Sequence, residues 1–495
     1  MLGRSRTVLV ASLVLFACLL WTTAAYATVE VEPNNTTSTA NFCPPGAVFT
    51  ASITPAGDAD YYVCTLTQGR VYTISAIGNS GFDPKVTIVD ASGALRSVMD
   101  QQLVYQQGLA RPNDCEFEFC APQTAIYYYQ VRKGAYGASA TGSYTFSLTD
   151  VGQHLTPTLP LRFGGADRYE VAANCASFAY GGGDYSAVRH VVIASGRDAA
   201  MADPLAASAL AGAYDAPLLL VRGDWPHTLP ASTAGQLAHI RSDIGSATLY
   251  IHIVGGPATV PDSLKAHLSS AAGSAVVDRI GGADRYAVAA NVAARIRTVL
   301  GLLYPRTCFI ANGQNPATFY DALACGPVAY KKHWPILLVR SSGVIPAVTA
   351  MAKSSYTTRY VVSTGNAVPS SASGPLGATM RLTGSDRTQM ARALAEEATI
   401  DPAKHWIGNE TSPDHWAWRL MLTNKVADAL TSCQVGGRLE GVVLYCTDAS
   451  HTSPQPKEYG ARNWWHSLYD VWIVGGPASV TDGVRLDFAK ACGYW

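Results

Sequence analysis

One eight-residue segment occurs three times in this chain, and it constrains the fold more than any other feature. The segment reads RFGGADRY from Arg162, RIGGADRY from Arg279 and, in a divergent form, RLTGSDRT from Arg381. The copies begin 117 and 102 residues apart. Such intervals are much longer than the roughly 20 to 50 residues of a solenoid repeat. The chain is therefore predicted to contain three small domains built on one plan.

Each copy is followed by the same succession of segments. An Ala-rich helical stretch leads to a Val/Ile/Leu-rich run, and then an acidic residue opens another helix, at Asp203, Asp321 and Asp428. A second apolar run follows, and the last strand of the first and third copies ends in Val-Gly-Gly, at 254–256 and 474–476. Buried runs that alternate with helices are typical of parallel sheets covered by helices. We therefore expect three α/β domains.

Residues 28–153 have a different composition. Short alternating runs such as 61–66 and 143–148, rich in Tyr, Thr, Val and Phe, are separated by Gly, Asn, Asp and Pro. This pattern is typical of strands joined by turns, so we expect an all-β sandwich followed by a short linker that two prolines stiffen. The expected domains are 28–153, 161–277, 278–380 and 381–495, with the linker at 154–160.

The first 27 residues have the three parts of a secretory signal peptide. Arg4 and Arg6 form a basic start, residues 8–21 are apolar, and Ala25-Tyr26-Ala27 is a small-x-small cleavage site. We place the start of the mature chain at Thr28. No later run reaches 18 uninterrupted apolar residues, so no transmembrane segment is expected after removal of the signal.

The overall composition excludes two classes of protein. Hydrophobic residues make up 48% of the chain and charged residues 15%, which excludes a disordered chain. The 36 Lys and Arg residues balance the 36 Asp and Glu residues, so no global positive charge favours nucleic acid or an anionic membrane. An anionic partner has to be recognised by a local group of residues.

The mature chain contains ten cysteines, because Cys18 lies in the predicted signal peptide. An even number in an exported protein favours disulfides, and no Cys-x-x-Cys pair indicates a metal or redox site. Spacing along the chain makes some pairs natural partners, although the sequence leaves the connectivity open. The pairs we expect are Cys115/Cys120, Cys308/Cys325, Cys433/Cys446, Cys43/Cys64 and Cys175/Cys492.

The three repeated domains resemble the type 2 cell-wall-binding repeat of Gram-positive surface proteins. The resemblance rests on the Arg-x-x-Gly-x-Asp-Arg opening, the Ala-Asp-x-Leu-Ala segment and the closing Val-Gly-Gly, which occur in this order. It implies a Rossmann-like or flavodoxin-like α/β unit, three of which surround a pseudo-threefold axis. It also implies a protein at the surface of a Gram-positive-type bacterium, attached non-covalently to an anionic wall polysaccharide. The third copy departs from the pattern at Thr383 and Thr388, and the middle copy lacks the closing Gly-Gly.

The N-terminal domain is similar to a bacterial pre-peptidase C-terminal (PPC) domain, an accessory β-sandwich of secreted proteins. The similarity rests on residues 31–35, 57–62 and 142–146. Some relatives bind Ca²⁺ through acidic and Asn side chains at the start of the domain, and oxygen ligands suit this cation. The alternative is a solvated strand start and turn with no metal. The residues that match are Glu30, Glu32, Asn34 and Asn35, with Asp58 and Asp60 as further donors.

Two interpretations of the repeated arginines remain open. In the first, the arginines offer forked donors to phosphate or carboxylate groups of a repeating polymer. In the second, the arginine that precedes each Ala-rich helix pairs with Asp203, Asp321 or Asp428 and locks two helices of its unit. The candidate polymer-binding residues are Arg162, Arg168, Arg279, Arg285, Arg381 and Arg387.

The sequence contains none of the common hydrolase signatures, such as His-Glu-x-x-His or Gly-x-Ser-x-Gly. No cofactor is required by the expected domains, and Ca²⁺ is the one candidate ion. The leading hypothesis is an exported, non-enzymatic surface protein anchored to the wall. One alternative is a cell-wall hydrolase of the amidase type. Another is an adhesin whose β-sandwich binds a host or matrix ligand.

Overall fold

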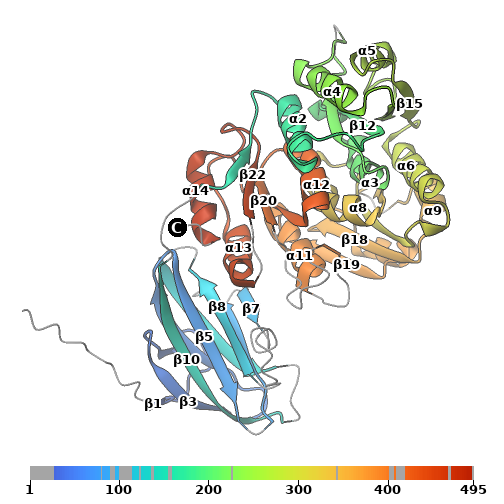
Figure 1. Ribbon diagram of the computed structural model, residues 1–495. Helices are drawn as coiled ribbons and strands as arrows, with labels where there is room; N and C mark the ends of the chain where they lie inside the picture. Colours follow the sequence, from blue (N-terminus) through green and yellow to red (C-terminus); the bar gives the residue numbers. More distant parts are fainter. Residues whose placement is uncertain are drawn as a thin grey trace, which may run out of the picture.

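A computed structural model shows a β-rich N-terminal domain and a larger α/β body (Figure 1). It describes residues 27–79, 81–89, 95–99, 114–121, 124–134, 139–153, 159–224, 227–341, 344–400, 406–407, 419–466 and 470–492. The predicted signal peptide up to Tyr26 and residues 154–158 of the predicted linker lie outside the described residues.

The N-terminal domain contains two five-stranded sheets, in agreement with the predicted all-β domain. Their inner faces meet around aromatic side chains, with the rings of Tyr62 and Phe146 stacked at 4.1 Å and Phe49 edge-on to Tyr62. In spatial order, the first sheet has β1 (Ala27–Val29), β3 (Val48–Ile53), β10 (Gly142–Gln153), β5 (Arg70–Gly78) and β8 (Asp114–Cys120). The second has β2 (Asn41–Phe42), β4 (Asp60–Leu66), β9 (Ala125–Lys133), β6 (Pro84–Val89) and β7 (Leu95–Met99).

The rest of the chain forms three α/β units, each with a four-stranded parallel sheet in which the first two strands named below are largely apolar and buried. The sheet of the first unit has β13 (Leu218–Val221), β12 (His190–Ser195), β14 (Tyr250–Val254) and β15 (Val276–Ile280). The second has β17 (Ile336–Val339), β16 (Thr307–Asn312), β18 (Thr358–Thr364) and β19 (Met380–Gly384). The third has β21 (Gly441–Tyr445), β20 (Arg419–Thr423), β22 (Asp470–Val474) and β11 (Leu161–Phe163).

The strand that opens each sequence repeat belongs to the sheet of a different repeat. β15 and β19, which contain Arg279 and Arg381, lie at the edge of the preceding unit's sheet. β11, which contains Arg162, pairs in parallel with β22 of the third unit. We call β11, β15 and β19 the shared strands. They link each unit to the next, and β11 joins the first repeat back to the last.

Helices surround the sheets. Asp167 and Asp284 cap α2 (Arg168–Ala179) and α6 (Arg285–Leu300), as predicted: backbone N–H groups of Tyr169 and Glu170, and of Ala287, donate to their carboxylates. The other α-helices outside the centre are α4 (Ala231–Ile244), α5 (Ser263–Ala271), α7 (Phe319–Ala324), α9 (Ala347–Lys353), α10 (Ser373–Leu376), α11 (Arg387–Ile400), α13 (Pro454–His466) and α14 (Asp482–Ala491).

One described helical stretch, Arg285–Leu303, has the length and mean hydropathy of a candidate membrane span. It consists of α6 and the turn that follows. One side of α6 is buried and packs on β17 and α9 of the second unit. This packing accounts for its apolar composition.

Three helices meet at the centre of the α/β body: α3 (Ala207–Ala213), α8 (Gly326–Lys332) and α12 (Val426–Leu439). The residues five positions after the three repeated aspartates are Ser208, Gly326 and Cys433. They touch, because a Cβ atom built on Gly326 would lie 2.9 Å from Cβ of Cys433 and 3.9 Å from Oγ of Ser208. Matching positions of the three repeats thus share one place in the core.

A second set of matching positions meets one helical turn further on. Tyr330 lies between Gly212 and Gly437, and a Cβ atom on Gly437 would lie 2.5 Å from the Tyr330 ring. The Tyr330 hydroxyl shares a hydrogen bond of 2.9 Å with the hydroxyl of Tyr180. The first and third repeats therefore have glycine where the second repeat has a large aromatic residue, so that the three helices pack closely.

The β-sandwich contacts the third unit, as Figure 1 shows, through β7 and β8 against α13. The Gln68 side chain donates a hydrogen bond of 3.3 Å to Asp487 on α14. Asp487 also pairs with Lys457 of α13 at 3.1 Å.

The prediction of disulfides is wrong for the described cysteines. Cys115 and Cys120 lie five residues apart on the single strand β8, a separation of roughly 17 Å that no disulfide spans. An even cysteine count was a weak guide because a buried thiol also serves as a small apolar core residue. The described cysteines are all buried, and the structure gives no disulfide between them: Cys43, Cys64, Cys115, Cys175, Cys308, Cys325, Cys433, Cys446 and Cys492.

We predict that Phe163→Ala destabilises the sheet of the third unit more than the sheet of the first. Phe163 is 4% exposed on shared strand β11, and its ring contacts Phe178 and Trp472. Loss of a buried Phe side chain costs about 3 kcal/mol or more. Hydrogen exchange measured by mass spectrometry should rise in β22. A rise confined to β12, with β22 unchanged, would contradict the shared-strand arrangement, and Leu382→Ala on β19 is the matched variant that should affect β18.

Candidate functional site

The first arginine of each repeat holds the loop that ends the neighbouring unit's sheet. Nη1 of Arg162 donates to the carbonyls of Gly475 and Val480, both at 2.8 Å, and Nη2 donates to Asp482 at 2.8 Å. Arg279 repeats this set with Gly255 (2.8 Å), Val260 (2.7 Å) and Asp262 (3.0 Å). Arg381 donates to the carbonyl of Val368. Because each arginine lies on a shared strand, it ties two repeats together.

The second arginine of each repeat holds the loop after the central strand of its own unit. Arg168 donates to the carbonyl of Gly196 at 2.6 Å and forms a two-pronged ion pair with Asp198. Arg285 donates to the carbonyl of Gly313 at 2.8 Å. Arg387 donates to backbone and side-chain oxygens of Asn424 and to the carbonyls of Cys446 and Thr447, and lies 4.5 Å from the Tyr320 ring centroid.

The predicted pairing of these second arginines with the three repeated aspartates is wrong. Burial raises the pKa of Asp203, Asp321 and Asp428, and all three turn toward the closing loops instead. The hydroxyls of Thr259, Thr364 and Ser479 donate to them at 3.1, 2.5 and 2.7 Å.

The hydrogen bond between the repeated aspartate and the loop that follows the third strand also requires a glycine in that loop. Gly475 has φ +116°, and a Cβ atom there would collide with the Asp428 carboxylate. Gly255 has φ +118°, and a Cβ atom there would lie 2.6 Å from the Thr259 hydroxyl. In the middle unit Thr364 meets Asp321 directly through its N–H and its hydroxyl. The missing Gly-Gly of that repeat thus reflects a different loop conformation.

The six candidate arginines therefore lie near the carboxyl ends of the parallel strands, where they hold loops. Arg162 and Arg279 are largely enclosed, with side chains 12% exposed, whereas Arg168 is 28% exposed. Ligands of open parallel sheets commonly bind at these strand ends. The structure brings both arginines of a motif to this side of the units, but most of their N–H groups donate to the protein itself.

Sequence reasoning missed two further arginines at the same strand ends. Arg222 and Arg340 directly follow the buried strands β13 and β17, and they lie 5.3 and 5.4 Å from the ring centroids of Tyr169 and Tyr286. The Arg222 side chain is 54% exposed and borders a cavity of about 550 Å³. The signal was present in the sequence, since Val-Arg follows the same apolar run in both repeats. The third repeat has Thr388 in place of the tyrosine.

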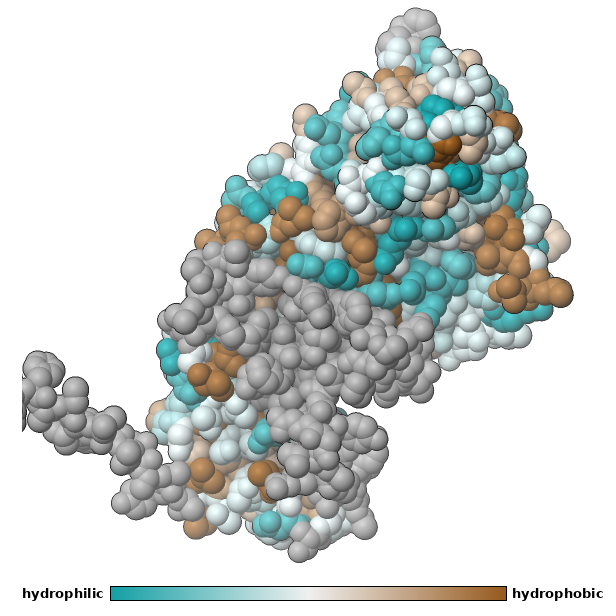
Figure 2. Space-filling view, viewed as in Figure 1, coloured by the Kyte–Doolittle hydropathy of each residue, from teal (hydrophilic) through white to brown (hydrophobic). Residues whose placement is uncertain are grey.

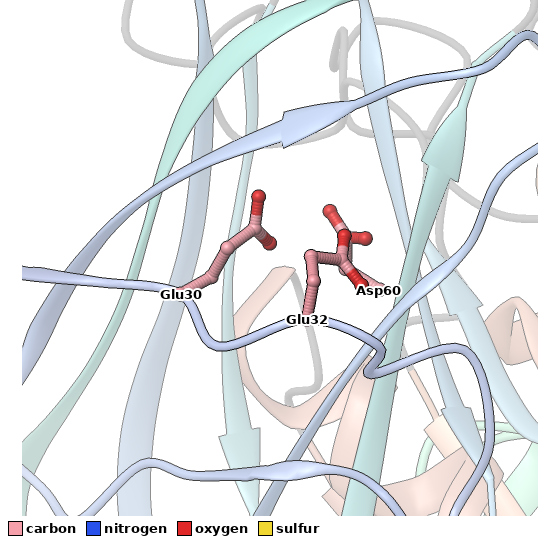
Figure 3. A group of neighbouring side chains, drawn as sticks. All are labelled: Glu30, Glu32 and Asp60. Atoms are coloured by element: carbon pink, nitrogen blue, oxygen red, sulfur yellow. The ribbon is translucent and has the colours of Figure 1, made fainter.

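The N-terminal domain contains a group of carboxylates, shown in Figure 3. Glu30, Glu32 and Asp60 each offer an oxygen, and these atoms lie within 4.8 Å of one another. Asn34 is buried beside them, and its side-chain N–H donates to Glu30 at 3.1 Å. Four of the six predicted ligands are thus gathered in one place.

The other two predicted ligands contact each other. The Asn35 side chain donates to Asp58 at 2.8 Å, and the N–H groups of Thr54 and Ala59 also donate to Asp58. These bonds are typical of a turn that a side chain stabilises. Asn35 and Asp58 therefore have structural partners outside the carboxylate group.

Two buried oxygens at the carboxylate group have no hydrogen-bond partner in the part of the chain that the structure describes: Oδ1 of Asn34 and Oδ1 of Asp60. Burial, together with the charges of Glu30, Asp58 and Glu32, raises the pKa of Asp60 to about 8. Burial also raises the pKa of Glu30. Three neighbouring carboxylates, together with one carboxylate oxygen and one amide oxygen that lack partners among the described residues, suit a hard cation such as Ca²⁺, which takes oxygen ligands.

Comparison with known proteins places these observations in a family. Residues 162–265, 279–373 and 381–485 match Cell wall binding domain 2 (CWB2). Over 266 residues the chain is 27% identical to N-acetylmuramoyl-L-alanine amidase LytC of Bacillus subtilis (strain 168), a match that covers 53% of this chain and 48% of the amidase.

Two solved structures from Clostridium difficile have a similar fold. Cwp8 and Cwp6 each align with a TM-score of 0.54 and 19% identity. The alignments cover 68% of this chain and 52% of Cwp8, and 87% of this chain and 68% of Cwp6. The chain thus spans about half the length of the amidase and of Cwp8. Since the three matched segments make up more than half of its length and coincide with the three α/β units, the chain belongs to the CWB2 family.

Proposed function

We propose that this protein is an exported, non-enzymatic surface protein that its three CWB2 units hold non-covalently on an anionic cell-wall polymer. The observation that carries the proposal is the match of all three units to a cell-wall-binding domain. The wall of a Gram-positive-type bacterium is the corresponding location. The β-sandwich is then an accessory module that contacts the third unit.

We also propose that the units are Rossmann-like and surround a pseudo-threefold axis. Support comes from the matching residues Ser208, Gly326 and Cys433, which touch at the centre, and from the three parallel sheets of one strand order. A rigid triple arrangement has a physical use. One exposed ion contact contributes about 1 kcal/mol or less, but contacts on one scaffold act together, and avidity can exceed a single affinity by roughly a hundredfold.

The candidate contacts at the strand ends are the N–H groups that the loop carbonyls leave free on Arg162, Arg168, Arg279, Arg285, Arg381 and Arg387. Because these side chains also hold loops, their replacement tests two roles at once. A change that lowers the thermal unfolding midpoint reports the structural role. A change that weakens wall retention at an unchanged midpoint reports the polymer contact.

We predict that the full chain is retained on purified walls and released by salt. Screening shortens the reach of exposed charges from about 10 Å at 0.1 M to about 3 Å at 1 M, so retention should fall steeply over that range. Walls stripped of secondary polymers are the control. Equal retention on intact and stripped walls would contradict the proposal.

The rival amidase and adhesin hypotheses give different results on the same material. LytC is named as an amidase, but its similarity to this chain covers 48% of its own length. Release of soluble fragments from purified walls would favour an amidase. Binding of a host or matrix protein that is lost when the sandwich surface is altered, with wall retention intact, would favour the adhesin.

We further propose that the N-terminal domain is PPC-like and binds one Ca²⁺ through Glu30, Glu32, Asn34 and Asp60. The proposal is supported by three carboxylates whose oxygens lie within 4.8 Å of one another, beside two buried oxygens without partners. A bound cation would offset the repulsion between the carboxylates and satisfy both oxygens.

We predict that Ca²⁺ binds the full chain with a dissociation constant of about 0.1–1 mM, as in other extracellular modules, and that E30Q/D60N abolishes the binding heat in titration calorimetry. The matched control E116Q/E118Q, which removes two charges from β8, should leave binding unchanged. Equal binding by both variants would refute the site.

The raised pKa of Asp60 also predicts a pH dependence. Without Ca²⁺, the folded state favours the protonated carboxyl, so the stability from this group is full below about pH 4 and is lost as the pH rises toward 8. Added Ca²⁺ should therefore raise the unfolding midpoint of the domain more at pH 8 than at pH 5. An effect that is equal at both pH values would argue against ligation by Asp60.

A further inference from the structure

The charges of this chain are distributed very unevenly among the three units. Residues 285–385, which make up most of the middle unit, contain ten Lys and Arg residues and one acidic residue, the buried Asp321, while Asp284 and Asp386 lie directly outside this stretch. Residues 168–284 contain seven basic and ten acidic residues, and residues 387–495 contain ten and twelve. The balanced charge of the whole chain therefore conceals one strongly basic unit between two mildly acidic ones.

Four of the basic residues gather at one edge of the middle unit. Arg306 directly precedes β16, and Arg359 lies at the start of the neighbouring strand β18. Arg297 and Lys353 lie in the last turns of α6 and α9. We call these four residues the basic edge.

Contacts around one turn hold the basic edge together. Arg297 donates to the Ser355 hydroxyl at 2.7 Å, and Nε of Arg359 donates to the Lys353 carbonyl at 3.2 Å. The Arg306 guanidinium lies 4.1 Å from the ring centroid of Tyr304, whose hydroxyl donates to the Ser355 carbonyl at 3.4 Å. Three guanidinium groups are thus held in place without a carboxylate.

The described residues provide no ion-pair partner for any of the four. The ion pairs that the structure gives for the basic residues of this unit lie at its borders: Arg295 with Asp278 of the first unit, and Lys331 with Glu440 of the third. Helix C-termini attract cations, which accounts for Arg297 and Lys353 but not for Arg306 and Arg359 at strand starts.

The same edge of the other two units carries carboxylates. In the third unit Arg419, the first residue of β20, pairs with Asp470 of β22 at 3.3 Å. In the first unit Arg189 occupies the place of Arg306, and Asp184 and Asp243 lie nearby, Asp243 accepting from the N–H of Tyr185 at 3.0 Å. An uncompensated basic edge is therefore particular to the middle unit among the described residues.

We propose that the basic edge of the middle unit makes the principal contact with the anionic wall polymer, and that the two flanking units serve mainly to position it. The inference rests on the proposed wall-binding function and assigns that function to one unit. Cations fixed by hydrogen bonds and stacking suit a ligand whose phosphate or carboxylate groups recur at a set spacing. The two acidic neighbours leave this edge as the most favourable place for such a chain.

An anionic lipid surface is the competing ligand. Leu302 and Leu303, on the turn between Arg297 and Arg306, are 99% and 88% exposed. Figure 2 shows hydrophobic colouring on the side of the molecule where Figure 1 places α6 and α9. We favour the polymer because a fluid bilayer does not require cations that are held in position, and the test below separates the two ligands.

The test compares two full-length variants with the same change in charge. R306E/K353E reverses two charges of the basic edge, and R189E/K85E reverses two charges in the first unit and the sandwich. Retention on intact walls at 0.1 M salt should fall about tenfold or more for the first variant and change less than twofold for the second. K353R keeps the charge and leaves the Arg306 stacking in place, so it should behave as the unaltered chain. Thermal unfolding midpoints establish that each variant is folded.

Other results would overturn the proposal, for three different reasons. If the unaltered chain is not retained, the wall-binding function itself fails. If the unaltered chain is retained and R306E/K353E is retained equally well, the wall-binding function stands but the basic edge is not its site. The same conclusion follows if wall retention falls as much for R189E/K85E as for R306E/K353E. If phosphatidylglycerol vesicles bind the chain and L302S/L303S removes both vesicle binding and wall retention, the ligand is a lipid surface. If R306E/K353E is unfolded, R306Q/K353Q takes its place and the same outcomes apply.

Discussion

The α/β body depends on one interaction, the pairing of a strand from one repeat with the sheet of another. Each unit has three strands of its own, and β15, β19 and β11 each add the fourth strand at one edge of a neighbouring unit's sheet. The arginine on each shared strand then donates to carbonyls of the loop that it reaches. Backbone pairing and charge-assisted hydrogen bonds thus act at the same three junctions. The three units are stable as a set because no sheet is complete within its own repeat.

The pattern that the three motifs share follows from this arrangement. Asp321 and Asp428 are buried and Asp203 is partly buried, and all three accept hydrogen bonds from the closing loops. The second arginine of each repeat holds the loop after the central strand. Most of the repeated residues therefore maintain the fold. Ligand contacts need charged groups that no carboxylate neutralises, and the basic edge meets this condition better than the motif arginines do.

Three units with the same fold can differ in their contribution to binding. The middle unit has lost the closing Gly-Gly and nearly all of its carboxylates, yet it retains the sheet and the central helix packing. A scaffold held together by shared strands tolerates such divergence on the outer faces, because surface charges contribute little to stability. The β-sandwich has a separate feature, the cluster of Glu30, Glu32 and Asp60, where two buried oxygens have no partner among the described residues. This cluster belongs to the sandwich and not to the repeats.

The sequence by itself determined the number of repeats, the two classes of domain, the helix caps at Asp167 and Asp284 and four residues of the carboxylate group, because these depend on periodicity, composition and local spacing. The disulfide prediction failed because a buried thiol also serves as a small apolar core residue, and the Arg–Asp prediction failed because side-chain pairing depends on how the loops pack. Only the tertiary structure decided that β11 pairs with β22, 311 residues away at Leu161 and Trp472, and that Arg297, Arg306, Lys353 and Arg359 share one edge. The physical reason is that strand pairing and charge clustering are set by where the chain returns in space, which residue order alone does not specify.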